Sequence, residues 1–482
     1  MTKPFTESPV EPSVGRNRIE KRSIDFVPER DRHGKVWQQI PFWFLGNFQI
    51  LALAVGFIGP SLGLSFGWCA LAGVLGVIVG TMVMAFHASQ GPRLGLPQLI
   101  QSRAQFGYLG VIPILLAGVV TFVGVNIVMI MTLREGLAAM FGWNKVLISV
   151  TASVLATVVA VFGHDWLHKT FRVLLYVSLP LYLILSAGSF FGPGREVTST
   201  APAAHFTLSG FLAFFSICTA WNIGYALYVS DYSRYLPSDT KTGSVIGAVF
   251  GGASASAIWL VLLGSWIATR ANVLDPLTTL RASGDAVIDG LGTVLVVGAV
   301  VTLAAVMSLN TYSCTLTLLT AQDSVRSNTP RTRARIITTI VLAAAILAVS
   351  LVLPSSALSA LNNVSLVIFY LLVPWSAINL IDFFGVRRGE YSVVDLFKID
   401  GLYGRWSWRG LTAYLTALVA AAPFPVFSFY TGPVAKQLGG VDISFVVSLV
   451  VAGGIYFVAT RSLDLESEHA AIRATAPPTS LN

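Results

Sequence analysis

Apolar runs long enough to cross a membrane follow one another almost without interruption along this chain of 482 residues. A hydrocarbon layer roughly 30 Å thick needs about 20 apolar residues for one helical crossing. Because lipid offers no hydrogen-bond partner to a free peptide group, these runs predict helices. Only 11% of the residues are charged, compared with about 25% in soluble domains, so the composition excludes a soluble protein.

The apolar runs predict an all-α integral membrane protein with twelve transmembrane helices. They leave an N-terminal tail at 1–36, a transmembrane domain at 37–461 and a C-terminal tail at 462–482. The expected spans are 38–63, 68–88, 109–133, 146–163, 171–192, 208–229, 243–268, 287–320, 335–354, 357–384, 410–430 and 441–460.

The basic residues are distributed unequally between the two sides of such a membrane protein. With both termini on the cytoplasmic side, 25 of the 31 Lys and Arg residues fall on that side and 6 on the other. This bias predicts a multi-pass protein of the plasma (inner) membrane with cytoplasmic N- and C-termini. The net charge of +8 is dispersed between apolar runs, so it does not indicate a nucleic-acid partner.

Two spans contain signals of a helix break. The first has Trp43, Gly46 and Asn47 followed by Gly56, and the sixth has the run WNIGY at 221–225. Each shows W-x-x-G and then a polar residue, five spans apart, which suits an inverted repeat with a broken helix in each half. Gly is also frequent throughout the chain, with 43 residues, so simple helix packing is the alternative explanation.

Three stretches carry a resemblance to a known family. They are FVPERDRHG followed by PFWFLGN at 26–47, SDYSRYLP at 230–237 and DFFGVRRGEY at 382–391. In this order and at these span ends, they resemble the purine–cytosine permease branch of the nucleobase–cation symporter family.

The resemblance implies the five-plus-five inverted-repeat fold of the leucine-transporter type with two extra C-terminal helices. The transmembrane transporter domain would then hold repeat one at about 37–195, repeat two at about 205–385 and the extra helices at about 410–460. The implied function is secondary active import of a nucleobase or related heterocycle by cation symport with alternating access. The implied partners are this small molecule and the lipid bilayer, and the oligomeric state stays open.

Family members hold the base between aromatic side chains of the third and sixth spans and bind it with amides of the third and eighth. The resemblance therefore points to Phe122, Asn126 and Asn310 as substrate-binding residues, with Phe122 where the family usually has Trp. Aromatic faces can stack on a flat ring, and an amide both donates and accepts hydrogen bonds at its edge. An intramembrane Asn can instead bind only a neighbouring helix.

In the sixth span, counting back from Asp231 reaches Asn222, and Trp221 and Tyr225 flank it on different faces. All three are kept as substrate-binding candidates. Backbone groups freed near Gly46, Asn47, Gly56 and Gly224 are expected to bind the cation or the substrate at the helix breaks.

Charged residues at the ends of two spans are expected to have a structural or gating role. Asp231 and Arg234 end the sixth span and predict an ion pair, and Asp382 ends the tenth. Charges are cheaper there than at a helix centre.

The coupling ion is H⁺ or Na⁺, with H⁺ slightly preferred. Sodium-coupled relatives place hydroxyl groups on the eighth span where this chain has Ala304 and Ala305, whereas Thr302 and Ser308 are displaced. The spans nevertheless lack a central Asp or Glu that could carry a proton.

The sequence predicts no metal site and no other cofactor. His164 and His168 are four residues apart in a basic segment, and we expect this spacing to be structural rather than metal-binding. A polytopic membrane enzyme is one alternative function, but no cluster of His, Asp, Glu or Cys supports catalysis, so we expect no enzyme. A passive channel for small neutral solutes is the other alternative, and it lacks rings of charge or a filter-like segment.

Overall fold

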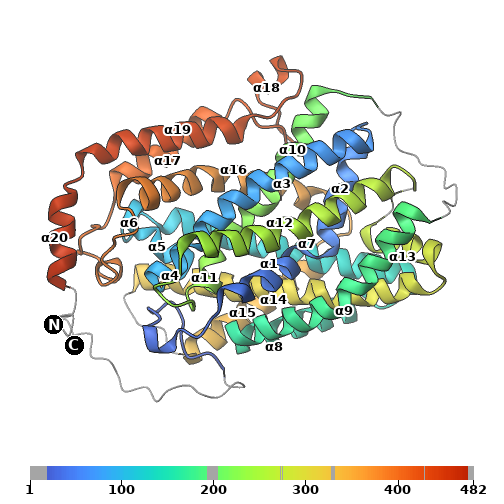
Figure 1. The fold of residues 1–482 in the computed structure, drawn as a ribbon, viewed down its shortest axis with the longest axis horizontal. Helices are drawn as coiled ribbons and strands as arrows, with labels where there is room; N and C mark the ends of the chain where they lie inside the picture. Colours follow the sequence, from blue (N-terminus) through green and yellow to red (C-terminus); the bar gives the residue numbers. More distant parts are fainter. Residues whose placement is uncertain are drawn as a thin grey trace.

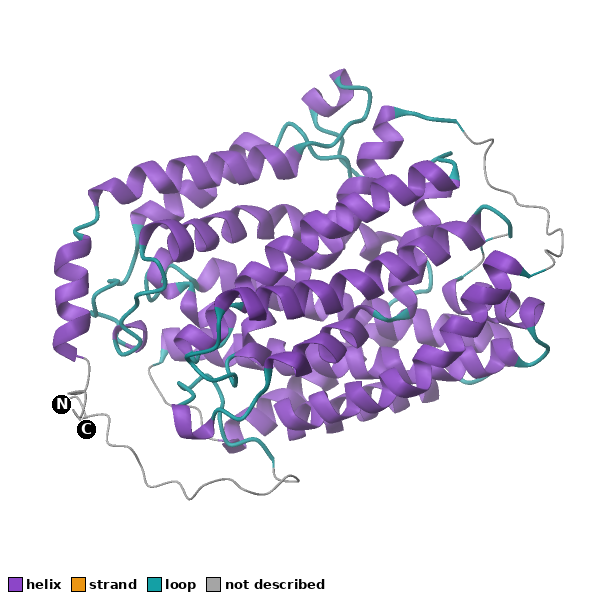
Figure 2. Cartoon of the chain, viewed as in Figure 1, coloured by secondary structure: helices purple, strands orange, loops and turns teal. Residues whose placement is uncertain are grey.

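A computed structural model describes residues 19–192, 205–271, 273, 275–326, 332–427 and 429–475. Over these ranges the chain forms helices and loops (Figure 2), with one isolated β-bridge between Val426 and Thr431. The outer parts of both predicted tails, 1–18 and 476–482, lie outside the described residues. The all-helical architecture is the one that satisfies backbone hydrogen bonds in lipid.

The predicted spans correspond closely to the observed helices. Nine helices of the described residues are long and apolar enough to cross a membrane, and the pair formed by α1 and α2, bent by 57°, makes a tenth span. The remaining two positions are taken by α16 and the short α17. The span helices are α1 (Gln39–Asn47) with α2 (Ile50–Ser61), α3 (Phe66–Ala88), α7 (Ile112–Phe141), α8 (Lys145–Phe162), α9 (His164–Phe191), α10 (Leu208–Ile223), α12 (Thr242–Ala268), α14 (Leu291–Val325), α15 (Thr332–Val352), α16 (Ala357–Leu380), α17 (Trp408–Ala421) and α19 (Ser444–Ala459).

The eleventh span was predicted at 410–430, which is wrong at its C-terminal end. Helix α17 ends at Ala421, because Pro423 and Pro425 follow and a proline cannot continue the helical hydrogen bonds. The chain then forms the short α18 (Pro433–Gln437) before α19. The predicted C-terminal tail also contains a helix, α20 (Leu465–Thr475).

The long helices run side by side, and short helices cover one end of the bundle (Figure 1). We call this end the Glu20 end, because the segment 19–38 that precedes α1 lies there. Helix α20 lies at the same end, and α13 (Pro276–Val287) lies at the opposite end. The short helices of the Glu20 end are α4 (Gln90–Leu94), α5 (Gln98–Gln101), α6 (Arg103–Phe106) and α11 (Val229–Ser233).

Glycines bring α2 and α12 into backbone contact. A Cβ atom added to Gly56 would lie 2.4 Å from the carbonyl oxygen of Val261, and one added to Gly264 would lie 2.1 Å from that of Leu53. The hydroxyl of Ser265 donates to the carbonyl oxygen of Gly56 at 2.9 Å. Gly56 was predicted to belong to a helix break, but it lies inside α2 and serves close packing.

Gly56→Ala is expected to destabilise the protein by about 1–3 kcal/mol, because the added methyl group meets backbone atoms that cannot move aside easily. Thermal unfolding of the purified protein in detergent measures this effect. Gly251→Ala in α12 is the matched control, because a Cβ atom there has no neighbour within 4 Å. Equal unfolding temperatures for the two variants would contradict the packing role of Gly56.

Candidate functional site

The first span is interrupted between Asn47 and Ile50. Helix α1 ends at Asn47, Phe48 leaves the helical conformation, and Gln49 is extended with φ −138° and ψ 159°. The predicted break is therefore in the right region, but Gly46 lies in the last turn of α1 rather than in the break itself. The freed backbone is buried, because Asn47 and Gln49 are at most 1% exposed.

The sixth span is interrupted at Gly224, as the sequence predicted. Helix α10 ends at Ile223, the chain continues as the 3₁₀ turn η3 (Gly224–Leu227), and Tyr228 separates this turn from α11. A Cβ atom at Gly224 would have no neighbour within 4 Å. This glycine therefore borders open space, not another helix.

Side chains of the sixth span bind the interrupted backbone of the first. The indole Nε1 of Trp221 donates to Asn47 Oδ1 at 2.7 Å, and the hydroxyl of Tyr225 donates to the carbonyl oxygen of Gly46 at 2.8 Å. The same hydroxyl accepts a hydrogen bond from Gln49 Nε2 at 3.2 Å. The two helix breaks are thus joined directly to each other.

A cavity of about 470 Å³ lies beside these two breaks. Its wall is mostly apolar, with a few polar groups from the break before α2, from α7, from α14 and from the sixth span. Of the predicted substrate-binding residues, Phe122, Trp221, Tyr225 and Asn310 line it, together with Gly224. A pocket of this size, apolar with few polar groups, is typical of a small-molecule site.

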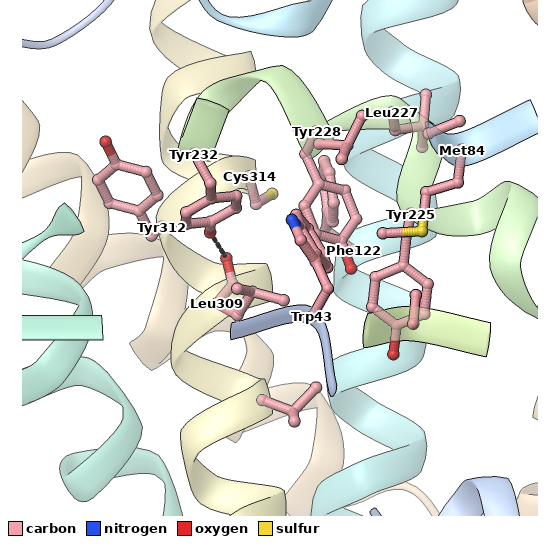
Figure 3. Packing of buried hydrophobic residues seen from close by; sticks show 14 of the residues in the cluster. Trp43, Met84, Phe122, Tyr225, Leu227, Tyr228, Tyr232, Leu309, Tyr312 and Cys314 are labelled. Atoms are coloured by element: carbon pink, nitrogen blue, oxygen red, sulfur yellow. Dashed lines mark hydrogen bonds between the residues drawn. The ribbon is translucent and has the colours of Figure 1, made fainter. Parts of the chain in front are cut away.

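Aromatic side chains that line this cavity pack close together, and Figure 3 shows Phe122, Tyr225 and Tyr228 beside Trp43. The rings of Phe122 and Tyr228 are 5.1 Å apart at an angle of 63°, and those of Tyr225 and Tyr228 are 5.6 Å apart. Trp43 of α1 packs behind them, 5.9 Å from Tyr225. Aromatic side chains from the first, third and sixth spans therefore meet at one place.

A chain of hydrogen bonds connects the amides of α7 and α14. The hydroxyl of Tyr228 donates to Asn310 Oδ1 at 3.1 Å, and Asn310 Nδ2 donates to Asn126 Oδ1 at 3.3 Å. Asn126 Nδ2 in turn donates to Thr311 Oγ1 at 3.0 Å. Asn126 thus lies behind Asn310 and orients it. Asn310 faces the cavity, where its other N–H makes only a long contact of 3.9 Å with Met129 Sδ and its Oδ1 keeps a second lone pair.

Asn222 does not lie at the cavity. It is fully buried between α10 and α3, where its Nδ2 donates to Thr81 Oγ1 at 2.7 Å. Its position next to Trp221 on the helix turns the side chain to the opposite face. The geometry therefore gives Asn222 a packing role, unlike its predicted role in substrate binding.

Gln49 and Tyr228 are among the cavity residues that the sequence analysis did not identify. Tyr228 lies seven residues after Trp221 and three after Tyr225. This i, i+4, i+7 pattern places the three on one helix face, and it could have identified Tyr228. Gln49 is a polar residue within an apolar span, and its Oε1 is buried without a hydrogen-bond partner among the described residues.

The predicted ion pair between Asp231 and Arg234 does not form. Arg234 Nη2 lies 3.4 Å from Glu20 Oε1, and its Nη1 donates to the carbonyl oxygen of Ser23 at 2.7 Å. Asp231 Oδ1 accepts a hydrogen bond from the backbone of Gln98 at 2.9 Å. The sequence could not show that Arg234 pairs with Glu20 instead of Asp231, because Glu20 comes from a distant segment.

Asp382 lies at the Glu20 end, as expected for a residue at the end of the tenth span. It lies in the first turn of the π-helical segment η4 (Ile381–Val386) and pairs with Arg387 at 2.5 Å. Arg387 also binds Glu468 of α20 at 2.6 Å. A buried ion pair with two carboxylates thus attaches the C-terminal helix to the helix bundle.

The hydroxyl groups considered for a sodium site are bonded within their own helix. Thr302 Oγ1 donates to the carbonyl oxygen of Ala299 at 3.0 Å, and Ser308 Oγ donates to that of Ala305 at 2.5 Å. The choice between H⁺ and Na⁺ stays a prediction.

The sequence profile of a family described as "Permease for cytosine/purines, uracil, thiamine, allantoin" matches residues 26–448. The chain belongs to this permease family. It is 32% identical over 450 residues to the putative purine-cytosine permease YxlA of Bacillus subtilis, covering 92% of this chain and 96% of that protein. It is 26% identical over 261 residues to the purine-cytosine permease FCY2 of Saccharomyces cerevisiae, covering 51% of this chain and 47% of FCY2.

The permease fold is similar to that of Mhp1, a nucleobase-cation-symport-1 family transporter solved in a closed conformation with bromovinylhydantoin bound. The TM-score is 0.70 at 18% identity, covering 93% of this chain and 99% of Mhp1. The inward-facing conformation of Mhp1 gives a TM-score of 0.65 at 17% identity, covering 95% of this chain and 98% of Mhp1. The predicted transporter fold and the resemblance to the nucleobase–cation symporters are confirmed.

Tyr225→Phe is expected to lower the stability of the permease by about 1–3 kcal/mol, because it leaves buried polar groups of Gly46 and Gln49 without their partner. Thermal unfolding in detergent measures the loss. Tyr176→Phe is the control, because Tyr176 is 71% exposed on the outer surface. An unchanged unfolding temperature in Tyr225→Phe would show that the two breaks do not depend on this hydroxyl.

Proposed function

We propose that the permease imports a nucleobase or a closely related planar heterocycle by cation symport with alternating access. The observation that carries the proposal is the cavity at the two helix breaks, where Phe122, Tyr225 and Tyr228 offer aromatic surfaces and Asn310 offers an uncharged donor and acceptor. A flat neutral ring with polar edges matches this combination.

The printed descriptions of the relatives support the same class of substrate. YxlA and FCY2 are purine-cytosine permeases by name, and another relative, TPN1 of Saccharomyces cerevisiae, is a vitamin B6 transporter. Mhp1 is described with a bound hydantoin. These molecules share a small heterocyclic ring, so the proposal names this ring and leaves its substituents to experiment.

We propose H⁺ as the coupling ion, a plasma (inner) membrane location, and cytoplasmic N- and C-termini. The bias of basic residues supports this orientation, which places the Glu20 end in the cytoplasm. Ala304 and Ala305 offer no hydroxyl group at the positions where sodium-coupled relatives carry one. The preference for H⁺ depends on this difference from the sodium-coupled relatives.

Phe122→Ala and Asn310→Ala are each expected to weaken substrate binding by about tenfold, which corresponds to about 1.4 kcal/mol of lost stacking or hydrogen bonding. Thermal-shift titration with a panel of cytosine, adenine, uracil, allantoin, hydantoin and pyridoxine first identifies a ligand for the wild type. Phe457→Ala is the matched control, because Phe457 is 49% exposed on α19, away from the cavity. Unchanged affinity in both cavity variants would remove this site assignment.

Uptake of the identified ligand into proteoliposomes is expected to saturate and to stop when a protonophore collapses the proton gradient. Replacement of Na⁺ by K⁺ is expected to leave the uptake rate unchanged. Loss of uptake on Na⁺ replacement would instead identify sodium as the coupling ion. Non-saturable flux that ignores both gradients would contradict symport and favour a passive channel.

A further inference from the structure

The corner between α8 and α9 receives the N-terminal segment at the Glu20 end. The backbone N–H of Glu20 donates to the carbonyl oxygen of Phe162 at 3.2 Å, and the N–H of His164 donates to Glu20 Oε2 at 3.2 Å. Between them, Gly163 has φ +88°, and a Cβ atom there would lie 2.2 Å from Glu20 Oε2. The segment that precedes α1 is therefore seated directly on this corner.

This seating brings together two histidines and an aspartate that are distant in sequence. His33 Nε2 lies 2.9 Å from Asp165 Oδ1, and His164 Nδ1 lies 2.9 Å from the same oxygen. The three potential ligand atoms all lie within 4.8 Å of one another. No sequence pattern groups His33 with His164, because 130 residues separate them.

The outer nitrogen of each imidazole is held by a backbone carbonyl group. His33 Nδ1 lies 2.9 Å from the carbonyl oxygen of Asp31, and His164 Nε2 lies 3.2 Å from that of Tyr232. A carbonyl oxygen only accepts, so each ring places its N–H there. A neutral ring then directs the lone pair of its inner nitrogen toward Asp165. This second-shell arrangement is the usual one for histidines that bind a metal.

We propose that His33 Nε2, His164 Nδ1 and Asp165 Oδ1 bind a divalent transition-metal ion of the Zn²⁺ class. Two imidazole nitrogens and a carboxylate oxygen are ligands that Zn²⁺ accepts in a tetrahedral site, with water as the fourth ligand. Ligand atoms about 2.0–2.1 Å from a tetrahedral ion are about 3.3 Å apart. The two nitrogen-to-carboxylate separations of 2.9 Å are a few tenths of an ångström shorter than this distance. The two imidazole nitrogens lie within 4.8 Å of each other, so rotation of the exposed His33 side chain would complete the geometry.

The surroundings suit a site that is both accessible and preorganised. The side chains of His33 and Asp165 are 56% and 59% exposed, whereas that of His164 is 7% exposed. The ring of His164 also packs 4.3 Å from that of Tyr235. One buried ligand is thus fixed by the fold, and two ligands face the solvent from which the ion would enter. A bound ion would link the segment before α1 to the start of α9.

The alternative to a bound metal ion is protonation of the cluster. In that state His33 donates a hydrogen bond to Asp165, which raises the pKa of His33 to about 9. Metal binding therefore has to be measured directly.

The test uses the full chain in detergent, purified with a tag that contains no histidine and stripped of metal with a chelator. Zn²⁺ is titrated by calorimetry and Co²⁺ by visible absorption. We expect one ion per chain and the intense absorption bands of tetrahedral Co²⁺. His33→Ala and Asp165→Asn should each weaken Zn²⁺ binding by at least about tenfold, since loss of an outer-shell partner alone costs about that much.

His469→Ala is the matched control, because His469 also faces a carboxylate, Glu390, at 3.4 Å but belongs to no metal-ligand group among the described residues. It should bind Zn²⁺ as the wild type does. Substoichiometric binding in the wild type, or equal Zn²⁺ affinity in wild type and His33→Ala, would overturn the proposal. The unfolding temperature of each metal-free variant verifies that it is folded. If Asp165→Asn is unfolded, the Zn²⁺ affinity of His33→Ala, a substitution of an exposed side chain, decides between the two outcomes.

Discussion

An interrupted helix inside a membrane bundle leaves peptide groups that lipid cannot satisfy, and this constraint organises the centre of the permease. The sixth span supplies hydrogen-bond partners at the break of the first. Trp221 binds the side chain of Asn47, and Tyr225 binds the carbonyl group of Gly46. These contacts leave Gly224 bordering open space. Both breaks therefore depend on each other, and the cavity lies where they meet.

The walls of that cavity are held by a second set of contacts. Tyr228, Asn310, Asn126 and Thr311 form one hydrogen-bonded chain across the sixth span, α14 and α7. A buried amide without partners would be costly, so the chain fixes the orientation of Asn310. An incoming ring would then meet an amide that is already positioned, with little side-chain entropy left to lose.

At the Glu20 end, one carboxylate binds side chains from three different spans. Glu20 accepts hydrogen bonds from the hydroxyl groups of Tyr235 and Tyr312 and lies near the guanidinium groups of Arg234 and Arg335. These partners come from the sixth, eighth and ninth spans. The segment before α1 is therefore part of the folded permease, although its composition alone predicted a tail.

The sequence by itself determined the membrane class, the positions of most spans, the region of both helix breaks and the residues Phe122, Trp221, Tyr225 and Asn310 at the cavity. Apolar run length is a local property, so the spans can be read along the chain. Phe122 and Asn310 followed from the resemblance to a known family. Only the tertiary structure decided that Asn222 faces α3, that Arg234 pairs with Glu20 instead of Asp231, and that His33 meets Asp165. Side-chain direction and partner choice depend on which helices pack together, and the distance along the sequence does not contain that information.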